Sequence, residues 1–327
     1  MQTVNQLMEK IEYAIRSHNL VWNSQPPVNL YEPVAYAMSA GGKRIRPLLV
    51  LLGCQLFSDE VDNALPAALA IEVFHNFTLL HDDIMDHADM RRGRPTVHRQ
   101  FSDNAAILSG DAMAFLAYKL LLESRTGEMQ QLTGLFTRTA LEVCEGQQYD
   151  MDFETRMEVS TSEYIEMIRL KTAVLLGCAL KAGAICGNAG DDSADGVYRI
   201  GINLGIAFQL QDDLLDTYGS EVEFGKKIGG DITANKKTYL LINALEMAPP
   251  AVRAELTGWI SRKEFSRDEK VRAVRDIYDL LNIREKTEQL IRAYTGDAME
   301  LLDNLPVDEI RKEKLREICL KLLNRNS

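Results

Sequence analysis

The sequence predicts an all-α protein. Proline accounts for only 9 of the 327 residues, and aromatic residues for only 7%. Leu, Ala, Glu, Met, Lys and Arg are plentiful, and all of them favour helices. Apolar residues recur at intervals of three and four along nearly the whole chain, as they do on one face of a helix. No run of alternating β-branched residues suggests a sheet, so we expect a large helical bundle.

The longest apolar stretch runs from Ala64 to His87. It is rich in Ala, Leu, Ile and Phe, and it contains no glycine. Its one proline, Pro66, lies near its start, where a helix tolerates proline. The same apolar spacing predicts the next helices at residues 104–122, 129–151, 161–187 and 194–218.

Pro306 separates two further predicted helices near the C-terminus, and we expect it to begin the second of them. No polar linker, short repeat or low-complexity tract interrupts the sequence, so we expect residues 1–327 to form a single domain. The apolar positions that predict these two helices are Leu290, Tyr294, Ala298 and Leu301 in the first, and Leu315, Ile318, Cys319 and Leu322 in the second.

The charge balance excludes some classes of partner. With 37 basic and 48 acidic residues, the net charge is −11, whereas nucleic acids and anionic membrane surfaces are bound by positive faces. No segment is apolar for long enough to predict stable membrane insertion, and the first residues do not resemble a signal peptide. The five cysteines include no C-x-x-C pair, which favours free thiols and a cytoplasmic location.

Many of the cations gather in three segments that are expected to be irregular. These segments are residues 39–47, 90–95 and 219–237, and each combines glycine with Lys or Arg. Long loops inside a compact protein are usually functional or disordered. We therefore examined the acidic motifs that accompany them.

The first acidic motif, Asp82-Asp83-Ile84-Met85-Asp86, comes at the end of the helix predicted from Ala64. Asp82 and Asp86 are one helical turn apart and share a face. Like charges at this spacing, at the negative end of a helix, require a counterion. Carboxylate oxygens suit Mg²⁺. Taken alone, the motif is equally compatible with a solvated acidic helix end.

The motif recurs as Asp212-Asp213-Leu214-Leu215-Asp216, which begins 130 residues later (212 − 82). It also ends a largely apolar helix, here running from Ile200 through Leu215. Solvated faces do not explain two such motifs, because their apolar neighbours require burial. Six carboxylates around one cavity would repel one another unless divalent cations neutralised them. The repeat therefore predicts a magnesium site.

Carboxylates, Mg²⁺ and clustered Lys and Arg together are typical of sites for phosphate-bearing substrates. The sequence contains no GxxxxGK[ST] loop for nucleotides and no G-x-S-x-G nucleophile motif. We therefore expect the substrate to carry its own leaving group, and the chain to supply no covalent nucleophile.

The ordered set of motifs resembles the trans-isoprenyl diphosphate synthases, the polyprenyl synthetase family that includes farnesyl and geranylgeranyl diphosphate synthases. The resemblance covers nearly the whole chain. It implies a large helical bundle of the isoprenoid synthase type with a deep central cavity, usually as a homodimer. The fragments that carry it are residues 41–47 (GGKRIRP), the first aspartate motif with Arg91-Arg92-Gly93, Lys171-Thr172, Phe208-Gln209 before the second motif, Gly225-Lys226, and Lys236-Lys237.

The resemblance also implies roles for individual residues. The contacts it implies for isopentenyl diphosphate are Lys43, Arg46, His75 and Arg92. Those implied for the allylic diphosphate are Arg91, Lys171, Thr172, Gln209, Lys226 and Lys236. The residues expected to be directly catalytic are Asp82, Asp86, Lys171, Asp212 and Lys226.

The same resemblance implies the cofactor and the reaction. Asp82, Asp86 and Asp212 would bind Mg²⁺ most directly, supported by Asp83, Asp213 and Asp216, with about three ions when a diphosphate is bound. Isopentenyl diphosphate would be condensed head-to-tail with dimethylallyl, geranyl or farnesyl diphosphate. The allylic diphosphate would ionise, the isopentenyl double bond would attack the resulting carbocation, and a proton would then be lost.

Side chains before the first motif are expected to set the product length. At ~1.5 Å per residue, Phe77 lies roughly 7 Å and Phe74 roughly 12 Å from Asp82 along the helix axis. Thr78 is small enough to let the first units pass. Farnesyl synthases of the family often carry aromatic residues at both the fourth and fifth positions before the motif, and the bacterial ones typically also carry two extra residues inside it. This chain has Thr78 and Phe77 there and no insertion, so we expect geranylgeranyl diphosphate, with farnesyl diphosphate as the alternative.

Three other functions are considered. A non-catalytic subunit of a heteromeric synthase would be expected to lack one aspartate motif or the cationic set, and both are intact. A terpene cyclase would not need the isopentenyl contacts. An HD-type metal phosphohydrolase is suggested by His81-Asp82, but His87 and His98 are poorly placed to complete its ligands, and the second aspartate motif stays unexplained.

Overall fold

The computed structural model describes residues 1–156, 158–219 and 228–323. Their contacts divide the chain into two compact units. The expectation of a single domain over residues 1–327 stays a prediction. Unit 1 comprises Met1–Arg138, Cys178–Tyr198 and Leu305–Leu315, and unit 2 comprises Thr139–Gly177, Arg199–Asn304 and Arg316–Ser327.

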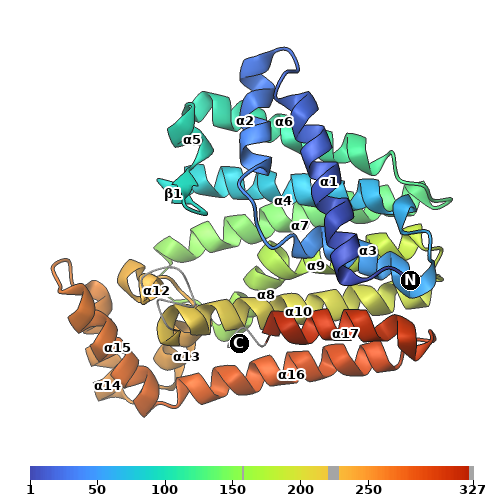
Figure 1. Cartoon of the computed structure of the whole chain (residues 1–327). Helices are drawn as coiled ribbons and strands as arrows, with labels where there is room; N and C mark the ends of the chain where they lie inside the picture. The colour runs from blue at the N-terminus through green and yellow to red at the C-terminus, as the bar shows by residue number, and fades with distance from the viewer. Residues whose placement is uncertain (157, 220–227, 324–327) are drawn as a thin grey trace. The chain divides into compact units, whose positions relative to one another are not determined.

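The described residues are mostly helical, which confirms the predicted fold class (Figure 1). The first elements along the chain are α1 (Val4–Trp22), α2 (Val28–Met38), α3 (Ile45–Phe57), the 3₁₀ turn η1 (Val61–Asn63), α4 (Leu65–Met85), β1 (Met90–Arg91), β2 (Arg94–Pro95), α5 (Val97–Gln100) and α6 (Asp103–Leu121).

The later elements are helices of very different lengths. They are α7 (Met129–Thr155), α8 (Thr161–Ile168), the π-helical turn η2 (Arg169–Ala173), α9 (Val174–Cys186), α10 (Asp191–Tyr218), α12 (Gly230–Ala234), α13 (Tyr239–Met247), α14 (Pro250–Ser261), α15 (Arg267–Leu280), α16 (Ile283–Asp303) and α17 (Glu309–Leu323).

Three local features differ from the sequence-based expectations. The helix expected over 161–187 is interrupted by the π-turn η2. The last helix begins at Glu309 and not at Pro306, because the backbone first turns, with the N–H of Val307 donating to the carbonyl oxygen of Leu305 (2.8 Å). The three cationic segments are not wholly irregular, since α3 begins inside the first at Ile45, β1 and β2 pair as an antiparallel hairpin in the second, and α12 lies inside the third.

Unit 1 is built around α3, which is buried along nearly its whole length. Two glycines let α3 and α9 approach closely. A Cβ on Gly53 would lie 3.1 Å from the carbonyl carbon of Leu180, and a Cβ on Gly183 would lie 2.7 Å from the backbone nitrogen of Cys54. α4 packs along α6 and against α3. The polar end of α4 is thereby held by a rigid apolar core.

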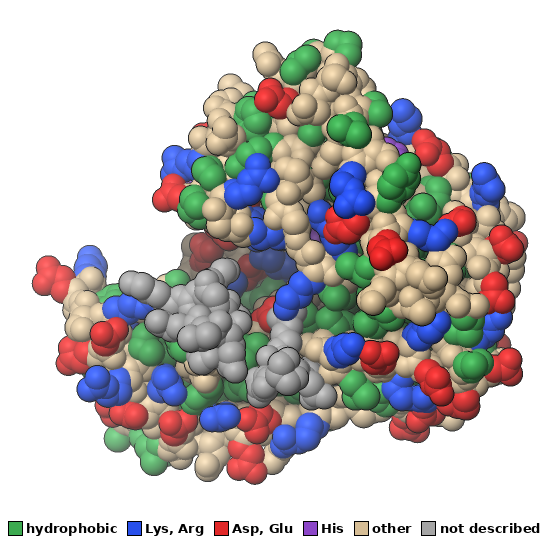
Figure 2. All heavy atoms as spheres, viewed as in Figure 1, with side chains coloured by type: hydrophobic (Ala, Val, Ile, Leu, Met, Phe, Trp, Pro, Cys, Tyr) green, Lys and Arg blue, Asp and Glu red, His purple; other side chains and the backbone are tan. Residues whose placement is uncertain are grey.

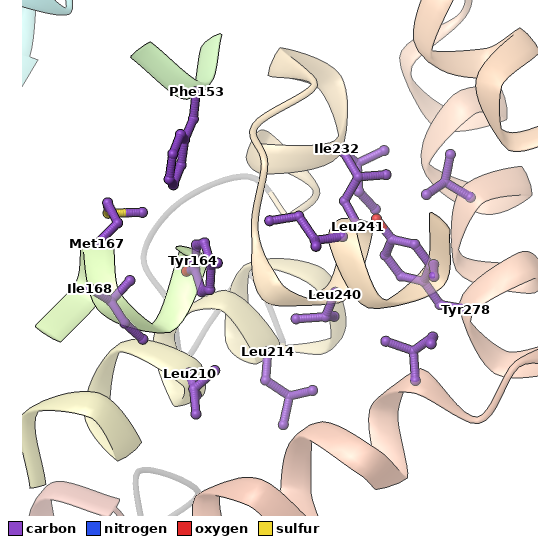
Figure 3. Packing of buried hydrophobic residues seen from close by; sticks show 14 of the residues in the cluster. Phe153, Tyr164, Met167, Ile168, Leu210, Leu214, Ile232, Leu240, Leu241 and Tyr278 are labelled. Atoms are coloured by element: carbon purple, nitrogen blue, oxygen red, sulfur yellow. The ribbon is translucent and has the colours of Figure 1, made fainter. Parts of the chain in front are cut away.

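Unit 2 has a separate apolar cluster, shown in Figure 3. α8 contributes Tyr164 and Met167, and α10 contributes Leu210 and Leu214, while α7, η2, α12, α13, α14, α15 and α16 supply the remaining side chains. Tyr278 of α15 is also fully enclosed in this cluster. The second aspartate motif therefore belongs to a helix whose apolar side is firmly packed.

Cationic and anionic side chains are interspersed on the face shown in Figure 2.

All five cysteines are free thiols, and Cys144 is the exposed one, whereas the other four are buried. Among the residues that the structure describes, no helix combines the length and the apolar character required to cross a membrane.

Candidate active site

The first aspartate motif lies where α4 ends, and backbone geometry explains this position. Asp86 is the C-cap, and its N–H donates to the carbonyl oxygen of Asp82 (2.8 Å). His87 then adopts a left-handed conformation with φ of +52°. The N–H of Ala88 turns back to the carbonyl oxygen of Asp83 (2.9 Å), as in a Schellman motif. Asp82 and Asp83 thus occupy the last turn, and the Asp86 side chain is exposed just beyond it.

Arg91 fixes the middle aspartate of this motif. Its Nε lies 2.7 and 2.8 Å from the two carboxylate oxygens of Asp83, and its Nη2 lies 3.4 Å from Oδ2 of Asp82. Burial raises the pKa of Asp83, although the charge of Arg91 acts in the opposite direction. Charge-assisted bonds of this kind hold both partners in one geometry. Asp82 and Asp86 are therefore the more accessible carboxylates of the motif.

The hairpin presents Arg92 beside the glycines of the first cationic segment. Arg92 and Gly93 form the turn with φ of +52° and +74°, as in a two-residue type I′ hairpin. Nη1 of Arg92 donates to the carbonyl oxygen of Gly41. A Cβ at Gly42 would lie 2.9 Å from the guanidinium carbon of Arg92. Glycine at position 42 therefore leaves the space that Arg92 occupies.

Arg46 and His75, which the resemblance implies as contacts of isopentenyl diphosphate, are hydrogen-bonded to each other. Nη1 of Arg46 donates to Nε2 of His75 at 3.1 Å. A guanidinium can only donate, so Nε2 must accept, and the imidazole is neutral with its proton on Nδ1. Burial, followed by the charges of Arg46 and Arg92, holds the pKa of His75 well below its usual range. His75 thus aligns Arg46 without cancelling its charge.

Arg44 was not expected to have a role, but it is buried within the first cationic segment, residues 39–47. Its side chain pairs with Glu72 of α4 at 2.5 Å and with Glu12 of α1 at 3.2 Å. Breaking a buried ion pair leaves a charge without a partner and strongly destabilises a protein. This network therefore anchors the segment that carries the predicted isopentenyl contacts. The available signal was Glu72, a carboxylate in a largely apolar stretch that requires a buried partner.

In unit 2, the second motif lies in the last turns of α10, and its middle aspartate is again the buried one. Tyr164 of α8 donates its hydroxyl to Oδ2 of Asp213, and Nε2 of Gln209 donates to Oδ1 at 3.1 Å. Burial raises the pKa of Asp213 to about 7. Figure 3 shows Tyr164 among the packed side chains of this unit. Asp212 and Asp216 are half-buried and so more accessible than Asp213.

Lys171 and Thr172 both lie in the π-turn η2. Nζ of Lys171 is 2.5 Å from Oδ2 of Asp150 on α7. The hydroxyl of Thr172 donates to Oε1 of Gln209 at 3.2 Å. Gln209 therefore joins Thr172 to Asp213, and one chain of hydrogen bonds connects the π-turn to the second aspartate motif.

Asp150 is a second residue that sequence reasoning missed. Burial raises its pKa, but the charges of Lys236 and Lys171 outweigh burial, and the pKa lies below its usual range. Asp150 thus links two of the lysines expected to contact the allylic diphosphate. Its signal in the sequence was weak, because an acidic residue on a polar stretch of helix is usually solvated.

Asp216 accepts two backbone hydrogen bonds near the start of α12. Its Oδ2 accepts the N–H of Asp231 (2.9 Å), and its carbonyl oxygen accepts the N–H of Gly229 (2.7 Å). Lys236 follows α12 and is exposed. Part of the role of Asp216 is therefore to anchor the start of α12. The predicted contact Lys226 lies outside the described residues, as does Gly225.

The residues expected to set product length form an aromatic row in unit 1. The ring centroids of Phe74 and Phe77 are 5.4 Å apart, and those of Phe77 and His81 are 4.8 Å apart. Phe136 of α7 meets the ring of Phe74 edge-on at 5.3 Å. The hydroxyl of Thr78 donates to the carbonyl oxygen of His75. Phe74 and Phe77 thus follow one another along α4, as the sequence indicated.

The donor set suits Mg²⁺, because each motif offers carboxylates that are less buried than its middle aspartate. Within the described residues, no group of three His, Cys, Asp or Glu side chains is already arranged around a metal position. Mg²⁺ usually keeps waters and takes only one or two carboxylates together with substrate phosphates. Asp82 and Asp86 in unit 1, and Asp212 in unit 2, would therefore each be suited to hold such an ion together with a diphosphate.

Comparisons with known proteins agree with these features. A profile of the polyprenyl synthetase family matches residues 27–278. The geranylgeranyl diphosphate synthase of Methanosarcina mazei is 38% identical over 281 residues, which cover 85% of each chain. A crystal structure of a geranylgeranyl pyrophosphate synthase covers 100% of each chain with 43% identity and a TM-score of 0.94.

A more distant relative was solved with ligands bound. The geranylgeranyl pyrophosphate synthase of Corynebacterium glutamicum, solved with isoprenyl diphosphate and magnesium, has 26% identity, a TM-score of 0.84 and 98% coverage of each chain. The family profile and the Methanosarcina mazei relative both extend over most of this chain. The protein therefore belongs to the polyprenyl synthetase family.

Proposed function

We propose that this protein is a Mg²⁺-dependent prenyltransferase that condenses isopentenyl diphosphate with an allylic diphosphate. One observation carries the proposal. In both aspartate motifs the middle carboxylate is buried and held by the protein, by Arg91 in one and by Tyr164 and Gln209 in the other. The first carboxylates, Asp82 and Asp212, are more accessible. Such fixed motifs orient metal ligands.

Bound Mg²⁺ would supply Lewis-acid stabilisation of the departing diphosphate. Arg91, Lys171, Thr172 and Lys236 would hold the same diphosphate as negative charge accumulates on it. The bond between the allylic carbon and the diphosphate oxygen breaks, and its electron pair leaves with the diphosphate. Gln209 helps to position Thr172 for this contact, because it accepts a hydrogen bond from the Thr172 hydroxyl.

The isopentenyl diphosphate would be held by Lys43, Arg46 and Arg92, with His75 aligning Arg46. Its terminal double-bond carbon attacks the allylic cation and forms the new carbon–carbon bond. The positive charge then lies on the methyl-bearing carbon of the former double bond, and the CH2 group beyond it loses a proton to the released diphosphate, which forms the new double bond. The products are inorganic diphosphate and a prenyl diphosphate that is five carbons longer. Positioning and electrostatic preorganisation supply the rate enhancement.

We propose geranylgeranyl diphosphate as the main product, with farnesyl diphosphate as the alternative. The aromatic row of Phe77 and Phe74 supports a floor for the growing chain, and the relatives described above are named geranylgeranyl synthases. Family membership and the two intact aspartate motifs make a phosphohydrolase or a non-catalytic subunit the weaker explanations.

We also propose a homodimer in the cytoplasm. Support for the dimer comes from a row of apolar residues at intervals of seven. Leu108 and Phe115 lie on α6, and Leu122 is the C-cap that follows it. Their exposed fractions are 60%, 75% and 58%. An apolar row of this spacing fits a second helix of the same kind. The five free cysteines support a reducing compartment.

The direct test of the proposed reaction is incorporation of labelled isopentenyl diphosphate with dimethylallyl, geranyl or farnesyl diphosphate as the primer. Separation of the dephosphorylated products by chain length identifies the product. We expect an all-trans product of twenty carbons from each primer. Absence of incorporation with all three primers would contradict the proposed activity, and a fifteen-carbon product from geranyl diphosphate would favour the alternative.

A further inference from the structure

The helical segment that carries Lys171 and Thr172 is wider than an α-helix. Residues Arg169–Ala173 form the π-turn η2, in which the hydrogen bonds span five residues and the backbone bulges outward. Single π-turns inside helices occur often at functional sites. Such a bulge needs space in the neighbouring helices.

Glycines on two neighbouring helices lie against the bulge. On α7, a Cβ at Gly146 would lie 2.7 Å from the carbonyl carbon of Leu170 and still nearer to the backbone nitrogen of Lys171. On α10, a Cβ at Gly205 would lie 2.6 Å from Cβ of Ala173 and still nearer to its Cα. Packed interiors do not absorb overlaps of this size without moving. Either alanine would therefore displace the π-turn.

Each glycine also precedes, by one helical turn, the side chain that binds the π-turn. Asp150 follows Gly146 by four residues, and Gln209 follows Gly205 by four residues, so each pair shares a helical face. Asp150 binds the ammonium of Lys171, and Gln209 binds the hydroxyl of Thr172. In both helices, the glycine sets how closely the helix backbone approaches the π-turn. The polar residue one turn later sets the direction of the Lys171 or Thr172 side chain.

We propose that Gly146 and Gly205 are positioning residues that place Lys171 and Thr172 for the allylic diphosphate. This inference rests on the proposed function, in which those two residues hold that diphosphate. A methyl group at either glycine would shift the backbone of the turn and, with it, the ammonium or the hydroxyl. A displacement of about 1 Å in a positioning element can lower a rate by about a hundredfold.

The test compares Gly146→Ala and Gly205→Ala with two matched controls. Gly134→Ala on α7 and Gly296→Ala on α16 place a Cβ where nothing lies within 4 Å. We expect the KM for the allylic diphosphate to rise about tenfold or more in the two test variants, while the KM for isopentenyl diphosphate changes by less than about twofold. Both controls should keep wild-type kinetics and should be no less stable, because alanine favours helices over glycine.

Lys171→Ala separates failure of this inference from failure of the proposed function. If Lys171→Ala leaves the allylic KM unchanged, the proposed role of Lys171 is wrong. If it raises the allylic KM but both glycine variants behave like the controls, the positioning role is refuted. If Gly146 acts by positioning Lys171, then Gly146→Ala should raise the KM for the allylic diphosphate little further in a protein that already carries Lys171→Ala.

Thermal unfolding of each variant identifies a merely structural effect. If one glycine variant fails to fold, the other still decides the outcome through its KM values. If both fail to fold, or if both raise the two KM values equally, the glycines serve the fold as a whole and the inference is overturned.

Discussion

His75 shows how one side chain can direct a cation without neutralising it. The imidazole accepts from Arg46, and the surrounding charges of Arg46, Arg92, Arg91 and Arg44 all disfavour a second proton on the ring. A carboxylate at this position would pair with Arg46 and reduce its attraction for a diphosphate. A neutral acceptor keeps the full positive charge available to the substrate.

This arrangement predicts that the folded protein loses stability in acid. The pKa of His75 is lowered in the folded state, so below about pH 6.5 the unfolded state binds more protons than the folded state. The free energy of unfolding should then fall with decreasing pH by up to about 1.4 kcal/mol per pH unit from this group, and the effect should vanish above about pH 6.5. His75→Gln, which keeps an acceptor but does not titrate, should lose this part of the dependence.

Urea unfolding at about pH 5 and about pH 7.5 measures the difference. His18→Gln, at a partly exposed position on α1, is the control and should unfold like the wild type at both values. An identical pH dependence in the wild type and in His75→Gln would contradict the assignment of a neutral imidazole.

The hydroxyl of Tyr164 is predicted to stabilise the second aspartate motif. Tyr164→Phe removes the donor to one oxygen of Asp213 and leaves that buried oxygen without it. We expect a loss of about 1–3 kcal/mol in the free energy of unfolding, together with a lower kcat. Tyr13→Phe, at a side chain that is 69% exposed, should change neither quantity. Unchanged stability and turnover in Tyr164→Phe would count against a supporting role.

The sequence identified residues with distinctive chemistry but not the partners that hold them. Asp82 and Asp212 were found because charged groups at the ends of apolar helices are unusual, whereas Lys171 was found only through the resemblance to the family. Tyr164 and Asp150 were missed, since a tyrosine or a single aspartate in a helix has no special pattern. Their roles depend on which helix packs beside them, and the periodicity of the sequence does not carry that information.

At the scale of elements, helices were predicted well where the apolar period was long and regular. The expectation for residues 64–87 corresponds to α4, and that for residues 194–218 corresponds to α10 with a start at Asp191. The π-turn inside 161–187 was missed, because one extra residue in a turn hardly disturbs the apolar pattern. The hairpin at Met90–Pro95 was missed because its strands are only two residues long.

The aromatic row on α4 is predicted to set the length of the product. Phe77→Ala should open space beyond the first units and shift the product beyond that of the wild type. Phe74→Ala should do so as well if its ring, which is 3% exposed and packed against Phe136, is the floor. Chromatography of the products after dephosphorylation measures the shift. If both single variants and the double variant make the wild-type product, neither ring sets the length.

At the scale of the whole molecule, the exposed apolar row on α6 predicts self-association. Light scattering at micromolar concentration should give a mass near twice 36.8 kDa for the wild type. Phe115→Lys places a charge in the row and should shift the mass towards that of one chain. Leu280→Lys, at another exposed apolar position, is the control and should stay dimeric. A monomeric wild-type protein would refute the homodimer.

The most direct measurement of the central claim is turnover of Asp82→Ala and Asp212→Ala with Mg²⁺ and with excess EDTA. Because each carboxylate would hold Mg²⁺ on the departing diphosphate, kcat should fall by at least about a hundredfold in either variant, with circular dichroism unchanged. Asp276→Ala, at an exposed position on α15, should turn over like the wild type. EDTA should abolish activity in the wild type. Near-wild-type turnover in either motif variant, or full wild-type activity in EDTA, would contradict the account.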